Sequence, residues 1–266
     1  MTQYAVVTGC PEAWWERFGL RFVESFIEHW PANVELHVCR DTDGRGPDDG
    51  RVQYHNRLKY SAGLRDFQTR HALNRQAAGL EQRKGRHWKP KALAEGYNWR
   101  YDALRFSNKV FSIEMVAGLV PGGRLYWVDA DVGTFAAVDP ALLDRLLPPA
   151  FALSCLDRGD YHSECGFVGY NLDHPETVPF IEAFANLYAF DGVFELAEWH
   201  DSWVFDWLRR ARNVPAHCIP HCSRHQPFVN SELGACMDHL KGGGKDGGRT
   251  KPQLMVAGHT HPYWRP

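Results

Sequence analysis

The sequence predicts an α/β fold in which a mostly parallel sheet is flanked by helices. Within the first 40 residues, a short β-branched run, an amphipathic helical stretch and a second β-branched run follow one another. Such a β-α-β unit builds a parallel sheet, because the crossover helix returns the chain to the same edge. Further apolar runs alternate with helical stretches over the rest of the 266 residues, and 44% hydrophobic and 23% charged residues are ordinary for a globular protein.

The expected elements follow in order along the chain. Residues 4–8 and 34–39 are β-rich runs, and apolar residues recur at helical spacing over 14–29 until Pro31 ends the helix. The later elements are a helix over 102–119, a strand over 124–132, a helix after Pro140, strands over 151–156 and 164–172, and helices over 176–189 and 201–211. No internal repeat divides the chain, so we expect a single domain over 1–266, with 230–266 as a C-terminal loop and tail.

The segment 57–109 differs from its surroundings because it is basic and aromatic. It holds thirteen Lys and Arg residues against four Asp and Glu residues, whereas the whole chain has a net charge of -2. Its aromatic residues include Tyr60, Phe67, Trp88, Tyr97, Trp99 and Tyr101. Basic side chains neutralise phosphates, and aromatic rings stack on unpaired bases. We therefore expect an insertion that contacts a polyanion such as DNA.

Composition also excludes several classes of protein. A net charge of -2 does not describe a uniformly basic nucleic-acid coat or an acidic tail. No apolar run approaches the roughly 18 residues of a membrane span. The first residues lack a basic leader with an apolar stretch, and the seven cysteines are odd in number and scattered. We expect reduced thiols in a cytoplasmic enzyme.

Two carboxylates, Asp129 and Asp131, end the apolar strand expected over 124–132. In a strand, residues two apart share a face, and ligands of open parallel sheets bind at the carboxyl ends of strands. Mg²⁺ and Mn²⁺ prefer oxygen ligands, which they share with substrate phosphates. We therefore expect this pair to hold Mg²⁺ or Mn²⁺, with a solvated turn as the alternative.

A glycine-rich stretch near the C-terminus supplies a second motif. Residues 239–245 read HLKGGGK. Glycines such as Gly242 let backbone amides approach phosphate oxygens, and Lys245 adds a point charge. Both are candidate diphosphate-binding residues, with a flexible surface loop as the alternative.

Together these motifs resemble the GT-A glycosyltransferases, which bind a nucleotide-sugar diphosphate through a divalent metal held by an Asp-x-Asp motif. His-x-x-Gly-x-x-Lys recurs near the C-terminus of the retaining members similar to glycogenin and the lipopolysaccharide galactosyltransferases. The resemblance implies a GT-A fold, a UDP-sugar as donor and a retaining transfer. It also implies that His239 is the third metal ligand beside Asp129 and Asp131, and that Lys245 holds the diphosphate.

The resemblance implies roles for residues in the first half of the chain. Arg105 and Lys109 share one face of the helix before the Asp-x-Asp strand, where the family has basic residues. They are expected to bracket the nucleotide or its diphosphate, and an exposed basic face is the alternative. Thr8 and Gly9 end the first strand, where the family meets the base and ribose.

Two acidic residues are candidates for the transfer step. Glu164 begins a segment, 164–171, that resembles the part of the family that lines the sugar pocket. Asp201 lies where a carboxylate faces the reaction centre in similar enzymes, and a helix cap is its alternative role. An inverting enzyme needs a general base, whereas a retaining enzyme needs an oxygen near the anomeric carbon or uses the leaving phosphate.

A cluster of His and Cys offers a different class of function. Cys218 and Cys222 lie among three histidines within nine positions. Thiolates and imidazoles bind zinc, so a nucleic-acid-binding protein with a structural zinc site is an alternative hypothesis. A nucleotidyltransferase is a weaker one, because the acidic Glu12 stands where such enzymes have a basic Gly-rich loop.

The leading hypothesis is a metal-dependent glycosyltransferase that uses a nucleotide sugar. Residues 105–111, which read Arg-Phe-Ser-x-Lys-Val-Phe, and the Trp-Val-Asp-Ala-Asp strand together look like small glycosyltransferases of bacteriophages, some of which modify hydroxymethyl-pyrimidines in DNA. The expected acceptor is therefore a hydroxymethylated base, which such an enzyme must flip out of a duplex. A polysaccharide or lipid-linked acceptor is the alternative.

Overall fold

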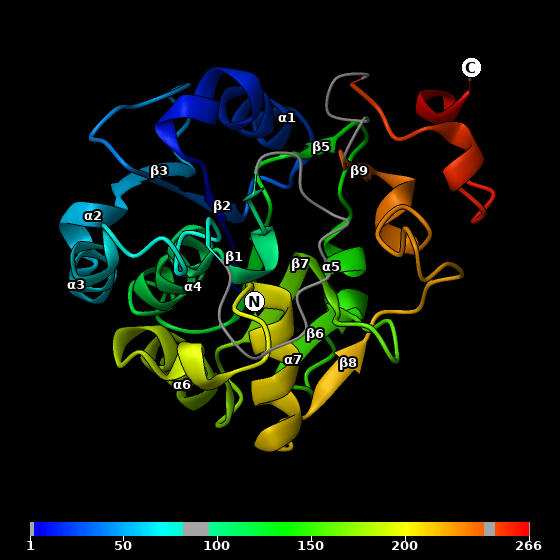
Figure 1. The fold of residues 1–266 in the computed structure, drawn as a ribbon. Helices are drawn as coiled ribbons and strands as arrows, with labels where there is room; N and C mark the ends of the chain where they lie inside the picture. The colour runs from blue at the N-terminus through cyan, green and yellow to red at the C-terminus, as the bar shows by residue number, and fades with distance from the viewer. Residues whose placement is uncertain (1–2, 82–95, 242–247, 266) are drawn as a thin grey trace.

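A computed structural model describes residues 3–81, 96–241 and 248–265 (Figure 1). Seven strands form one sheet, in which β7 alone runs against the other six. Across the sheet the strands are β3 (Val52–Asn56), β2 (Val34–Arg40), β1 (Tyr4–Gly9), β4 (Arg124–Val128), β7 (Glu164–Asn171), β6 (Leu153–Leu156) and β8 (Ala216–Cys218). The predicted α/β class with a mostly parallel sheet is confirmed.

Helices cover both faces of this sheet (Figure 1). They are α1 (Leu20–His29), α2 (Arg57–Tyr60), α3 (Ala62–His71), α4 (Ala103–Ala117), α5 (Pro140–Leu146), α6 (Thr177–Ala189) and α7 (Asp201–Ala211). In β1, Ala5 and Val7 pack in the core with α3, α4, α6 and α7, whereas Val6 packs in the core with α1 and α5. Because strands buried on both faces need apolar residues at every position, β1 and β4 read as continuous apolar runs.

The strand expected over 124–132 ends early, at Val128. The chain turns over the two aspartates, and Val132 N donates to Asp129 O at 2.9 Å. A second, two-stranded sheet then starts with β5 (Val132–Thr134), which pairs with β9 (Met237–His239). In this antiparallel register Val132 lies opposite His239. The break after β4 therefore brings the C-terminal part of the chain to the end of the central sheet.

The described part of the basic segment 57–109 is helical and packs against the main body of the protein. α2 and α3 contact α4, and α4 contacts β1. Several basic side chains form ion pairs here, such as Arg70 with Asp191 at 3.0 Å and Arg57 with Asp41 at 2.5 Å. Residues 82–95, with five of the thirteen bases, lie outside the described residues.

Two sequence expectations concern the chain as a whole. All seven cysteines are free, as expected for reduced thiols. Within the described ranges, no helix is both long and apolar enough to cross a membrane.

Candidate active site

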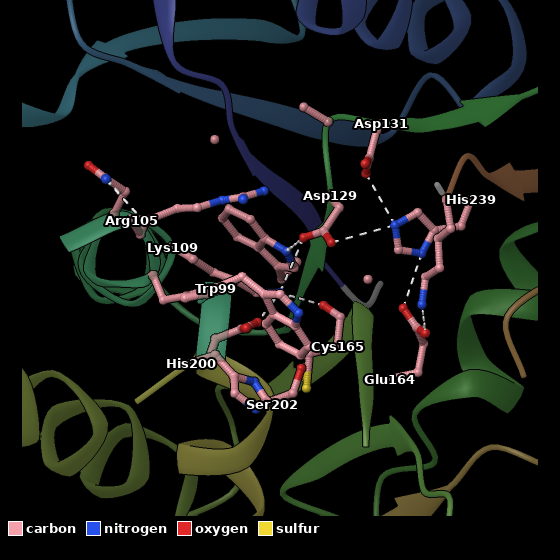
Figure 2. A pocket seen from close by; sticks show the side chains of 18 of the residues that line it. Trp99, Arg105, Lys109, Asp129, Asp131, Glu164, Cys165, His200, Ser202 and His239 are labelled. Atoms are coloured by element: carbon pink, nitrogen blue, oxygen red, sulfur yellow. Dashed lines mark hydrogen bonds and ion pairs between the residues drawn. The ribbon is translucent and has the colours of Figure 1, made fainter. Parts of the chain in front are cut away.

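A cavity of about 790 Å³ lies at the carboxyl ends of β1 and β4. The first residues of β7 and of α7 also line it, because β7 runs against its neighbours and α7 begins at this edge of the sheet. Figure 2 shows its side chains, which come from segments far apart in the sequence. This is the edge at which open α/β sheets bind their ligands.

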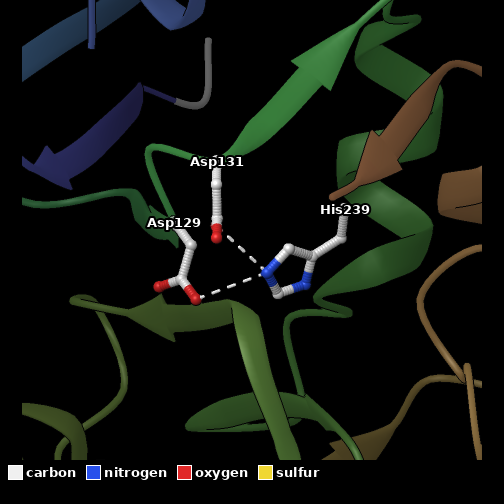
Figure 3. Close-up of side chains that lie close together, drawn as sticks. All are labelled: Asp129, Asp131 and His239. Atoms are coloured by element: carbon white, nitrogen blue, oxygen red, sulfur yellow. Dashed lines mark ion pairs between the residues drawn. The ribbon is translucent and has the colours of Figure 1, made fainter. Parts of the chain in front are cut away.

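Asp129, Asp131 and His239 meet at one side of the cavity (Figure 3). Nε2 of His239 lies 3.1 Å from Asp131 Oδ1 and 3.7 Å from Asp129 Oδ2. Ligand atoms of all three residues lie within 4.8 Å of one another. The pairing of β5 with β9 positions the imidazole, and Leu240 N donates to Asp131 O at 3.1 Å beside it.

This trio has the composition of a site for a divalent cation. Burial alone would lower the pKa of His239, but the carboxylates of Asp131 and Asp129 raise it above its usual value. The trio is therefore a place where positive charge is stabilised, whether as a proton or as a metal ion. Carboxylates suit Mg²⁺ and Mn²⁺, and an imidazole nitrogen is a ligand for transition metals. The residues present fit the expected Mn²⁺ or Mg²⁺.

Lys109 of α4 joins the trio of Asp129, Asp131 and His239 to the opposite wall of the cavity. Its Nζ lies 3.2 Å from Asp129 Oδ1 and 2.7 Å from Asp201 Oδ2, and it donates to the carbonyl oxygen of Cys165 at 2.5 Å. Burial opposes its charge, but the two carboxylates raise the pKa of Lys109 above its usual value. An ammonium group has three donors, and these three contacts occupy them. The expected contact of Lys109 with a diphosphate stays a prediction, and these contacts do not favour it.

Asp201 is a buried carboxylate at the start of α7. The alternative role of helix cap is wrong, because the side chain of the preceding residue, His200, accepts from Trp203 N at 3.4 Å. Burial would raise the pKa of Asp201, but the Lys109 ammonium and His200 hold it below its usual value. The group is therefore an anion that lines the cavity, 2.7 Å from the lysine.

The other predicted site residues fall in four groups. Gly9 and Arg105 line the cavity, and the guanidinium of Arg105 lies 5.0 Å from the ring centroid of Trp14. Thr8 is buried beneath the cavity floor and is absent from its lining. Gly242 and Lys245 lie outside the described residues. Glu164 lines the cavity, but its carboxylate oxygens contact His239 and Lys241.

The zinc site considered around Cys218 and Cys222 does not assemble. Cys218 Sγ lies 3.9 Å from Asp157 Oδ2, whereas Cys222 Sγ lies 3.5 Å from the carbonyl oxygen of Asn230. In the part of the chain that the structure describes, the only group of three or more metal-ligating side chains is Asp129, Asp131 and His239.

Sequence reasoning missed two residues that shape this site. Trp127 donates from Nε1 to Asp129 Oδ1 at 2.6 Å, and the two-residue spacing along β4 could have revealed this contact. Lys241 pairs with Glu164 across 77 residues of sequence, so no local signal identifies the pair. Burial lowers the pKa of Lys241 to about 8.

No protein-family model and no curated protein matches the chain. Among solved structures, it is similar to apo mouse xyloside xylosyltransferase 1, at 9% identity and a TM-score of 0.48, over 80% of this chain and 84% of that one. It is also similar to the apo glycosyltransferase GlyE of Streptococcus pneumoniae TIGR4, at 12% identity and a TM-score of 0.44, over 82% of this chain. The match covers 45% of the GlyE chain. At these values, neither likeness assigns an activity to this chain.

Proposed function

We propose that the chain is a metal-dependent glycosyltransferase of the GT-A type, which moves a sugar from a nucleoside diphosphate sugar to an acceptor hydroxyl. The observation that carries the proposal is the meeting of Asp129, Asp131 and His239 at one side of a cavity large enough for such a donor. A cavity of about 790 Å³ lies within the usual range for small-molecule sites.

The residues of the cavity have different roles in the proposed transfer. Asp129, Asp131 and His239 would hold the metal, and the metal would neutralise charge on the departing diphosphate. Lys109 holds the carboxylates of Asp129 and Asp201 in place through its two ion pairs. Asp201 is ionised and faces the cavity, so it can stabilise positive charge that develops at the anomeric carbon.

Gly9 and Arg105 support the nucleotide part of the proposal. Gly9 lies at the carboxyl end of β1, where its backbone is open to the cavity and can approach a base or ribose. Arg105 is exposed at the cavity, so its guanidinium can reach a diphosphate. The proposed contact of Lys245 with the diphosphate concerns a residue outside the described ranges.

For the acceptor we propose a hydroxymethylated pyrimidine of DNA. The cavity mouth carries Trp14 and Trp99, which are 40% and 37% exposed, and the cation of Arg105. Aromatic rings and an Arg side chain can stack a base that has left the duplex. The same surface would also hold a saccharide, so a polysaccharide or lipid-linked acceptor is the second candidate.

The test measures nucleoside diphosphate release from a panel of UDP- and GDP-sugars with Mn²⁺, for the wild type and Asp131→Asn. Loss of one group that stabilises charge in the transition state costs about 10²–10³-fold in rate, and we expect a loss of this size. Asp160→Asn is the matched control, because this carboxylate is 95% exposed and lies outside the cavity. Equal rates for wild type and Asp131→Asn, or no release from any donor, would contradict the proposal.

The acceptor is tested in the same assay. DNA with hydroxymethylcytosine or hydroxymethyluracil should stimulate release and acquire the sugar, as read by mass spectrometry. Stimulation by saccharides or lipid-linked sugars alone would replace DNA with the second candidate. The anomeric coupling constant of the product, measured by NMR, tests whether the transfer is retaining.

A further inference from the structure

Glu164 and His239 form a buried contact behind the metal-ligand trio (Figure 2). Glu164 is the first residue of β7, His239 is the last residue of β9, and both side chains are 5% exposed. Oε1 of Glu164 lies 3.1 Å from Nδ1 of His239, within ion-pair distance but without the alignment of a hydrogen bond, and Oε2 is paired with Nζ of Lys241. Both carboxylate oxygens are therefore engaged by protein groups, one on each side.

This contact decides which ring nitrogen of His239 can bind a metal. An ionised carboxylate only accepts, so Glu164 beside Nδ1 favours the imidazole tautomer that carries its proton on Nδ1. Nε2 then presents its lone pair toward Asp131 and Asp129, at 3.1 and 3.7 Å. Three acceptors that face one another repel unless a cation lies between them.

Gly166 leaves the space in which the imidazole sits. A Cβ at this position of β7 would lie 2.4 Å from both Nδ1 and Cε1 of His239, and 3.0 Å from Glu164 Oε1. Real side chains do not approach so closely, so a glycine is needed for the ring to lie against this strand. The carboxylate of Glu164 and the space that Gly166 leaves thus define one position for the imidazole ring of His239.

We propose that Glu164 is a positioning residue that orients His239 as a metal ligand, and that the ion pair with Lys241 holds Glu164 in place for this task. The inference rests on the proposed metal site. It gives Glu164 a different task from the sugar contact expected from the sequence, because each of its oxygens already faces a protein group. Carboxylate–histidine–metal chains of this kind are a general way to fix a ligand's tautomer and raise its basicity.

The test is Mn²⁺ binding by the purified full chain, followed through the sharp electron paramagnetic resonance signal of free aqueous Mn²⁺, without any donor. Glu164→Gln keeps the side chain's shape but replaces one of its two oxygens with an NH2 donor, so either His239 or Lys241 loses the acceptor that faces it. Loss of an outer partner of this kind costs about 10–100-fold in metal affinity, and we expect a loss of that size.

A double substitution separates the effect of orienting His239 from the effect of removing the charge of Glu164. In Glu164→Gln/Lys241→Met, the amide oxygen is free to accept from Nδ1–H of His239, so affinity should recover toward the wild-type value. Lys241→Met alone supplies the baseline for removing a nearby cation, and the double-mutant cycle isolates the coupling of the two side chains. Glu198→Gln is the matched control, because Glu198 makes a similar contact, at 2.9 Å, with His200 on the far side of the cavity.

The outcomes are distinguishable. If the wild type does not bind Mn²⁺, or His239→Ala binds it equally well, the proposed metal site is wrong. If His239→Ala loses binding while Glu164→Gln stays within about twofold of the wild type, the metal site stands and the positioning role is overturned. A loss in Glu164→Gln that matches the loss in Glu198→Gln would also overturn it, because a change in charge alone would explain both.

Discussion

Two regions of the molecule each bury a histidine, with opposite electrostatic results. His239 lies at the carboxyl end of the sheet beside Asp129 and Asp131, which raise its pKa against the effect of burial. His37 lies in the middle of β2, where Nδ1 is 2.9 Å from Nε2 of His55 and the two rings stack. Burial, and then the neighbouring imidazole, lower the pKa of His37 to about 4.

The comparison shows that burial alone does not make a histidine a ligand. Both side chains are almost fully enclosed and both line a cavity, since His37 borders one of about 670 Å³. The difference lies in the atoms that face the ring. The carboxylates of Asp129, Asp131 and Glu164 lie within 4 Å of the His239 ring and make a place for a cation. His37 has one carboxylate at 3.8 Å, that of the more exposed Glu35, and a second imidazole at 2.9 Å, which together leave its ring neutral.

The largest difference between the two regions should appear in Mn²⁺ affinity when each histidine is replaced separately by alanine. His239→Ala removes a metal ligand, so Mn²⁺ affinity should fall by at least the roughly 10–100-fold that loss of an outer partner costs. His37→Ala should leave Mn²⁺ affinity unchanged in the folded protein. Electron paramagnetic resonance titration of both variants checks this, and equal losses would break the comparison.

The second largest difference between the two regions should appear in the pH dependence of stability. Because the pKa of His37 is lowered on folding, the unfolded chain binds more protons between about pH 4 and 6.5, and stability falls as pH falls through this range. A shift of this size corresponds to about 3 kcal/mol at pH 4. His37→Gln should flatten the slope of unfolding free energy against pH, measured by urea unfolding. A slope equal to that of the wild type would show that His37 does not cause this pH dependence.

Gly166 and Gly133 offer a matched pair of small substitutions near the metal-ligand trio. Gly166→Ala should destabilise the fold by about 1–3 kcal/mol, because a new Cβ would overlap the His239 ring. Gly133→Ala should cost less, since the nearest atom to its Cβ would be Arg21 Nη2 at an ordinary 3.6 Å. Urea unfolding of the two variants measures the difference, and a larger cost at Gly133 would contradict the packing described.

The smallest effect is expected in the Cys/His cluster. Cys218→Ser and Cys222→Ser should each change the unfolding free energy by no more than about 0.5 kcal/mol, because both thiols are exposed and neither joins a ligand group. Metal analysis after chelation should find the same zinc content in variants and wild type. Stoichiometric zinc that disappears in both variants would restore the zinc hypothesis.

Local signals in the sequence predicted most of the fold. Helix α7 begins and ends as expected over 201–211, and β6 and β7 lie within the strands expected over 151–156 and 164–172. These elements carry strong apolar periodicity, which is set by neighbours in sequence. The break after Val128 was not expected, because it depends on the pairing of β5 with β9, which begins 103 residues after β5 ends.

The candidate site was predictable only in part for the same reason. Asp129 and Asp131 were predicted as site residues from their place after an apolar strand. His239 was predicted from the resemblance to a known family. The tasks of Lys109 and Glu164 were not visible, because they depend on partners up to 92 and 77 residues away. A charged residue in a sequence shows its sign, but its neighbours in space decide whether a ligand can reach it.

The position of β9 after the sheet has a consequence for how the protein is made. All seven strands of the central sheet precede residue 219, so they leave the ribosome before His239 does. The scaffold can pair its strands before the third proposed metal ligand has left the ribosome. The nascent chain would therefore hold two aspartates at the sheet edge, and only the closing of β9 against β5 would complete the trio.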